Sequence, residues 1–149
     1  MRTPDDELGR IVRRLLRTMH VLDGHDYGGV RVTLSEVMAL GELDADQPLT
    51  QRELGDRLGL DKSTISRLVG AMESRGWLAR ERDPRNRRFA IVSLTEAGSA
   101  TAERVAGHVA GMHVQLLGAL TEDERRGLIA GLSGIARVID DTGGAPGEQ

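Results

Sequence analysis

The middle of this chain constrains its fold more than any other part. Two short segments with helical apolar spacing, residues 50–58 and 61–75, are separated by Gly59. Two segments that alternate apolar with polar or small residues, 77–82 and 89–94, follow them and are typical of strands. The order of helix, tight turn, helix and hairpin predicts a small helical unit carrying a two-stranded β-hairpin.

Three of the expected helices share one start signal, a threonine followed three residues later by a glutamate. In such a pair the threonine hydroxyl accepts from the third helical N–H, and the glutamate accepts from the N–H of the threonine. Each pair precedes a run with apolar periodicity, so each predicts a helix start. The pairs are Thr33 with Glu36, Thr50 with Glu53, and Thr121 with Glu124.

Amphipathic helices are also expected on both sides of the central unit. Residues 5–22 have apolar side chains at helical spacing, and residues 95–140 predict a long helix followed by a second one. Residues 23–32 are rich in turn formers and predict a loop, and residues 142–149 are expected to be disordered. The expected inward side chains include Leu34, Val37, Met38 and Leu40 in the helix that starts at Thr33, and Leu116 in the long helix.

The composition excludes several classes of protein. The chain has no cysteine, which removes disulfides, thiolate catalysis and cysteine-bound metals. Hydrophobic residues make up 39% and charged residues 29%, a balance typical of a folded soluble domain. No apolar run approaches the ~18–20 residues of a membrane span, and the N-terminus lacks the apolar stretch of a signal peptide. We therefore expect a cytoplasmic protein, with a largely aliphatic core because only three residues are aromatic.

The charge is unevenly distributed along the chain. The net charge is −3, yet residues 50–88 carry 10 basic and 6 acidic side chains, a local charge of +4. The segments before and after this one are both acidic. A basic middle between acidic ends indicates one surface suited to a polyanion.

The helix, turn, helix and hairpin together predict a winged helix-turn-helix. In this fold the second helix of the pair lies in the major groove of DNA while the first crosses the backbone. The helix expected at 61–75 has a polar face made of Ser63, Ser66, Arg67 and Gly70. Arg67 could read guanine, because a guanidinium pairs with the O6 and N7 atoms of that base.

Arginines cluster at the tip of the predicted hairpin. Arg85, Arg87 and Arg88 lie within four residues, and arginine inserts readily into a narrow minor groove. Asp83 would be repelled by DNA, so we expect its carboxylate to support a wing arginine, with Arg88 as the predicted partner.

Residues 50–98 resemble the MarR family of multiple-antibiotic-resistance regulators. The recognition-helix pattern of that family is met by L-D-K-S-T-I-S-R-L-V at residues 60–69. The wing pattern is met by D-P-R-N-R-R-F-A-I-V-S-L-T-E-A-G from Asp83 onward. The flanking helices match in placement and length, which extends the resemblance to about residues 5–140.

The resemblance implies one MarR-like domain over residues 1–149, mainly α with a small β-hairpin wing. Residues 33–94 would form the winged lobe, and the helices at 5–22 and 95–140 would form the platform of a homodimer. Members mostly repress transcription at a pseudo-palindromic operator. They release double-stranded DNA when a small lipophilic or phenolic ligand binds between platform and lobes.

Two sets of candidate site residues follow. The DNA-binding candidates are Thr50, Gln51, Lys62, Ser63, Thr64, Ser66, Arg67, Arg85, Arg87 and Arg88. A ligand pocket could be lined by Leu15, Met19, Met38, Val109 and Met112. The same five apolar residues would also serve as ordinary core, and we favour the core.

Metal binding and catalysis are not expected. His108 and His113 are five residues apart and do not share a helix face, while His20 and His25 straddle a helix end. No nucleophile motif or phosphate loop is present, so we expect neither an enzyme nor a cofactor. The alternative to a DNA-binding regulator is a winged-helix module that binds another protein, whose affinity would depend little on salt.

Overall fold

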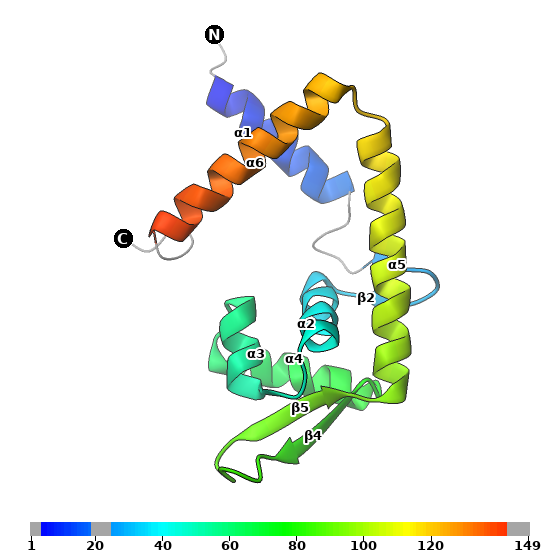
Figure 1. Cartoon of the computed structure of the whole chain (residues 1–149), viewed down its shortest axis with the longest axis vertical. Helices are drawn as coiled ribbons and strands as arrows, with labels where there is room; N and C mark the ends of the chain where they lie inside the picture. The colour runs from blue at the N-terminus through cyan, green and yellow to red at the C-terminus, as the bar shows by residue number, and fades with distance from the viewer. Residues whose placement is uncertain (1–3, 19–24, 143–149) are drawn as a thin grey trace. The chain divides into compact units, whose positions relative to one another are not determined.

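The computed structural model describes residues 4–18 and 25–142 (Figure 1). The helices are α1 (Pro4–Thr18), α2 (Leu34–Ala45), α3 (Gln51–Leu58), α4 (Lys62–Ser74), α5 (Glu96–Gly118) and α6 (Glu122–Thr142). The strands are β1 (His25–Asp26), β2 (Arg31–Val32), β3 (Leu49–Thr50), β4 (Leu78–Arg82) and β5 (Ala90–Leu94). The chain forms two compact units that divide within α5, after Val109.

The predicted start signals are confirmed at all three helices. Thr33 Oγ1 accepts from the Glu36 N–H at 3.2 Å, and a Glu36 carboxylate oxygen accepts from the Thr33 N–H at 2.8 Å. The same reciprocal pair of bonds is present at the starts of α3 and α6. Two terminal expectations fall outside the described residues: the last four residues of the 5–22 helix, and the tail beyond Thr142, which itself ends α6.

The helix-turn-helix and hairpin have the predicted order. Gly59 ends α3 at a φ of +65°, a left-handed conformation that glycine adopts without strain. Asp61 caps α4, and β4 pairs antiparallel with β5 from Leu78↔Leu94 to Arg82↔Ala90. Helix α4 therefore leads directly into the hairpin (Figure 1).

The three shortest strands were not predicted. The expected loop at residues 23–32 contains β1 and β2, which pair antiparallel. Strand β3 adds a third strand beside β5, so the sheet order is β3-β5-β4. Each of these strands has two residues, too few for apolar alternation to appear in the sequence.

One aliphatic core with a single tryptophan holds the lobe together, in agreement with the composition. Its buried side chains come from β2, α2 to α4, the sheet and the first half of α5. They are Val32, Ala39, Leu40, Leu43, Leu49, Leu54, Ile65, Val69, Met72, Trp77, Leu78, Val92, Ala102 and Val105.

The predicted inward face of α2 was partly wrong. Leu40 is buried, but Leu34 and Met38 are each 45% exposed, while Glu36 is buried. The buried face is rotated because Glu36 accepts from both the Thr33 N–H and the Arg75 guanidinium. Leu116 of α5 was also expected to point inward and is 52% exposed.

Helix α6 has the predicted apolar stripe, but none of its described residues is buried. Leu128, Leu132, Ile135 and Ile139 are between 40% and 57% exposed. No helix in the described part of the chain is long and apolar enough to cross a bilayer.

Candidate nucleic-acid interface

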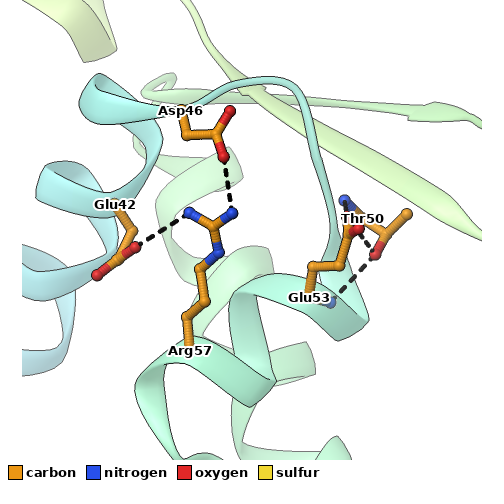
Figure 2. Close-up of polar contacts among 5 residues, drawn as sticks. All are labelled: Glu42, Asp46, Thr50, Glu53 and Arg57. Carbon is orange, nitrogen blue, oxygen red and sulfur yellow. Dashed lines mark hydrogen bonds and ion pairs between the residues drawn. The ribbon is translucent and has the colours of Figure 1, made fainter.

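Helix α3 is held against α2 by one arginine between two carboxylates (Figure 2). Arg57 Nη2 lies 2.7 Å from Asp46 Oδ2, and Nη1 lies 3.3 Å from Glu42 Oε2. These hydrogen bonds, first to Asp46 and then to Glu42, raise the pKa of the Arg57 guanidinium above its ordinary value. The same close-up shows the Thr50–Glu53 capping bonds that fix where α3 begins.

The N-terminus of α4 is organised around Asp61. Asp61 Oδ1 accepts from the Thr64 N–H at 2.8 Å and from the Ser63 hydroxyl at 2.8 Å, while Oδ2 accepts from the Thr64 hydroxyl at 3.0 Å. The Thr64 backbone bond and then these hydroxyl bonds lower the pKa of Asp61 from 3.8 to about 2. The hydroxyl protons of Ser63 and Thr64, both predicted DNA contacts, are thus engaged within the helix start.

The other predicted contacts on α4 face solvent. Lys62, Ser66 and Arg67 are exposed, while Ile65 and Val69 are buried in the core. Arg67 Nη2 lies 3.4 Å from Thr64 Oγ1, so one donor makes a long hydrogen bond and the other guanidinium donors face solvent. Helix α4 therefore presents two exposed cations, Lys62 and Arg67, to solvent.

The wing turn is closed by its backbone and by Asp83. The Asp83 N–H donates to the Phe89 carbonyl at 3.0 Å, and the Asn86 N–H donates to the Asp83 carbonyl at 3.2 Å. The side chain of Asp83 is 8% exposed. One of its oxygens accepts from the Arg85 N–H at 2.8 Å and lies 3.5 Å from Arg85 Nε. The prediction that Arg88 is the partner of Asp83 was therefore wrong. Arg85 is two positions along the turn from Asp83, which brings it within reach of the buried carboxylate.

The wing arginines point into solvent. The Arg85 side chain is 88% exposed, and Arg87 and Arg88 are also exposed. The Arg87 carbonyl accepts from Arg82 Nη1 at 3.3 Å, and Asn86 Oδ1 accepts from the Arg88 N–H at 3.2 Å. The backbone of the tip is fixed while the three guanidinium groups remain accessible.

A hollow of about 550 Å³ lies where the start of α3, the start of α4 and the wing meet. Four predicted contacts line it: Thr50, Gln51, Lys62 and Arg88. A second, smaller hollow of about 340 Å³ is lined by Arg87, Arg88 and β4 residues. The remaining candidates, which are Ser63, Thr64, Ser66, Arg67 and Arg85, line neither hollow.

Arg80 was missed by the sequence reading and lines both hollows. Its Nη2 donates to Glu73 Oε2 of α4 at 3.0 Å, across from strand to helix. Strand alternation could have found it, because Arg80 shares its face with Leu78, which packs into the core beside α4.

The predicted ligand-pocket residues are only partly described. Leu15 and Met38 are exposed, Val109 and Met112 are half-buried, and Met19 lies outside the described residues. The pocket stays a prediction. Within the described ranges, no cluster of three or more His, Asp or Glu side chains is arranged to hold a metal ion.

Comparison with known proteins places this geometry in a family. The sequence pattern of the MarR family matches residues 32–88. The organic hydroperoxide resistance transcriptional regulator of Bacillus subtilis is 29% identical over 89 residues, 58% of this chain. The match spans about 60% of the length of that regulator.

Solved structures match over more of the chain. The PcaV transcriptional regulator from Streptomyces coelicolor is 30% identical with a TM-score of 0.74, covering 89% of this chain and 97% of PcaV. PcaV in complex with its natural ligand matches with a TM-score of 0.71. The transcriptional repressor CouR, bound to a 23-mer DNA duplex, is 30% identical with a TM-score of 0.72, covering 90% of this chain and 92% of CouR. The helix-turn-helix, the wing and these matches together show that the chain belongs to the MarR family.

Proposed function

We propose that this chain is a DNA-binding transcriptional regulator that places α4 in the major groove and the wing in the adjacent minor groove. The observation that carries the proposal is that α4 and the wing both present exposed cations: Lys62 and Arg67 on α4, and Arg85, Arg87 and Arg88 on the wing. Lys62 and Arg88 line the same hollow between these two elements. The CouR relative bound to a DNA duplex supports the same assignment.

The division of labour among the contacts follows from their chemistry. Arg67 is the candidate base reader, because its open guanidinium can donate twice to one guanine. Lys62 and the main-chain N–H groups at the start of α4 would bind phosphates, since Ser63 and Thr64 already donate to Asp61. Arg85, Arg87 and Arg88 would enter the minor groove, where the negative potential attracts arginine.

The functional unit in this proposal is a homodimer in which the whole chain acts as one MarR-like domain. Helix α6 has an apolar stripe with no buried residue, and Leu8, Ile11, Val12 and Leu15 of α1 are between 43% and 55% exposed. Apolar faces of this size are typical of surfaces that associate. A dimer would place two lobes about 34–36 Å apart on a pseudo-palindromic operator.

We further propose that the regulator represses transcription and is released by a small lipophilic or phenolic ligand. The support comes from two relatives of this chain: CouR is a repressor, and PcaV has a natural ligand. The expected outcome is that a promoter overlapping the bound site is transcribed less in vitro when the protein is added. A panel of phenolic acids should contain a compound that restores transcription and dissociates the complex.

The first experiment is enrichment of bound sequences from a random duplex pool, followed by fluorescence anisotropy on the enriched duplex and a scrambled one. A regulator should bind the enriched duplex preferentially, with affinity falling by ~10³-fold or more between 50 and 200 mM salt. Sedimentation of the free protein should give twice the chain mass. Binding that is absent, or indifferent to sequence and salt, would instead indicate the protein–protein module.

A further inference from the structure

Arg80 crosses from the wing to the groove-facing side of α4. It leaves β4 on the same face as buried Leu78, and its guanidinium reaches Glu73 of α4 at 3.0 Å. A Cβ added at Gly70 would lie 4.0 Å from the same Nη2 atom. The guanidinium therefore lies beside the one position on this stretch of α4 that carries no side chain.

Arg80 also lies between the exposed lysine of α4, Lys62, and the arginines of the wing tip. It lines the larger hollow together with Lys62 from the start of α4. It lines the smaller hollow together with Arg87 from the wing tip. Lys62, Arg80 and Arg87 thus form a cationic track from the recognition helix to the wing.

Duplex geometry places one strand of backbone over that track. A major groove and the minor groove beside it are separated by a single sugar–phosphate strand. If α4 occupies the first groove and the wing the second, that strand must pass between them, where Arg80 lies. This step rests on the proposed function.

We infer that Arg80 binds the DNA phosphate backbone between the two grooves and that Glu73 is a positioning residue that holds its guanidinium there. Glu73 occupies one of the five guanidinium N–H donors, which leaves others for phosphate oxygens. The Arg80 side chain is 31% exposed, so it is partly ordered before DNA arrives yet remains reachable. A phosphate contact fixes orientation and carries no sequence information by itself.

The test uses the full chain and the enriched duplex. Arg80→Ala should weaken binding to the enriched and the scrambled duplex by the same factor. It should also reduce the slope of log affinity against log salt by about 0.9 for each protomer bound. Arg80→Lys retains the charge and should retain the slope. Arg10→Ala, which removes another ion-paired arginine on α1, is the control and should leave the slope unchanged.

A neutral methylphosphonate, placed at each backbone position in turn, locates the contact. The wild-type protein should lose affinity at one position per half-site between the two grooves, and Arg80→Ala should show no loss there. Glu73→Ala should lose part of this discrimination, whereas Glu73→Gln, whose amide oxygen still accepts from the guanidinium, should retain it. Thermal melting of each variant checks that the lobe is folded.

The outcomes separate this inference from the proposed function. If no duplex is enriched and bound, the proposed function fails and the inference fails with it. If wild-type protein binds but Arg80→Ala keeps both its salt slope and its methylphosphonate loss, the Arg80 contact is wrong and the regulator stands. If Arg80→Ala behaves as predicted but Glu73→Ala behaves like wild type, the Arg80 contact stands and the positioning role of Glu73 is wrong.

Discussion

Replacing Gly98 by alanine tests how closely α5 approaches the junction between α4 and β4. A Cβ at Gly98 would lie 2.0 Å from the Trp77 carbonyl oxygen and 2.9 Å from its carbonyl carbon. Both atoms belong to the backbone, so no side chain can rotate away. The same carbonyl oxygen accepts from the Thr95 N–H at 3.0 Å, and the Thr95 hydroxyl donates to the Gly76 carbonyl at 2.5 Å. Relieving the clash therefore displaces hydrogen bonds that anchor α5.

The expected magnitude follows from three contributions. Overpacking a tight contact costs about 1–3 kcal/mol. Weakening one backbone hydrogen bond costs about 0.5–1.5 kcal/mol. The higher helix propensity of alanine returns about 0.5–1 kcal/mol. The net loss in free energy of unfolding is centred near 2 kcal/mol, which corresponds to a fall of about 4–8 °C in Tm for a chain of this size.

Gly107→Ala is the matched control on the same helix. A Cβ at Gly107 meets no atom within 4 Å, so only the propensity gain applies and Tm should stay level or rise. Both variants should be melted at one fixed protein concentration, because the proposed homodimer would couple Tm to concentration. If Gly98→Ala melts at or above wild type while Gly107→Ala behaves as expected, the close approach of α5 to Trp77 is refuted.

Three further outcomes are expected. Thr33→Ala removes an N-cap acceptor and should lower the free energy of unfolding by about 1 kcal/mol in urea titration, whereas Thr33→Ser should retain most of it. Asp61→Asn removes the carboxylate whose pKa is lowered to about 2. Because the depressed pKa stabilises the fold only while Asp61 is ionised, the stability gap between wild type and variant should be constant above about pH 4 and should close as the pH falls towards 2. Arg67→Ala should weaken binding by about 1–3 kcal/mol and relax preference at one base pair, as measured by anisotropy on single-base variants of the duplex; an unchanged preference would exclude base reading by Arg67.

The sequence predicted best where a local pattern decides the structure. Threonine and glutamate three residues apart fix helix starts through bonds within one turn, and all three such starts are confirmed. Gly59 and Asp61 delimit the turn between α3 and α4 for the same local reason. The order of elements in the lobe followed from these short-range signals.

The errors arose where partners lie far apart in sequence. Glu36 is buried because Arg75, 39 residues away, donates to it, and no periodicity in α2 contains that information. Arg80 was missed because it reaches Glu73 from another element, a contact that no pattern within β4 contains. Asp83 contacts Arg85 and not the predicted Arg88, because which arginine comes within reach of the carboxylate depends on the conformation of the turn.

The residues from Arg75 to Trp77 connect five elements of the lobe, α2, α4, α5, β2 and β4, at one point. The Trp77 N–H donates to the Met72 carbonyl and so ends α4, while the Gly76 and Trp77 carbonyls accept from Thr95 at the start of α5. Arg75 lies 3.6 Å from the centre of the Trp77 ring, pairs with Glu36 at 3.2 Å and donates to the Arg31 carbonyl at 2.7 Å.

Because these contacts share neighbouring backbone groups, the first turn of α5 cannot move without moving the end of α4 and the start of β4. Helix α4 and the hairpin of β4 and β5 are attached to α5 through that junction. A displacement of the first turn of α5 would therefore move α4 and the hairpin together and not one alone.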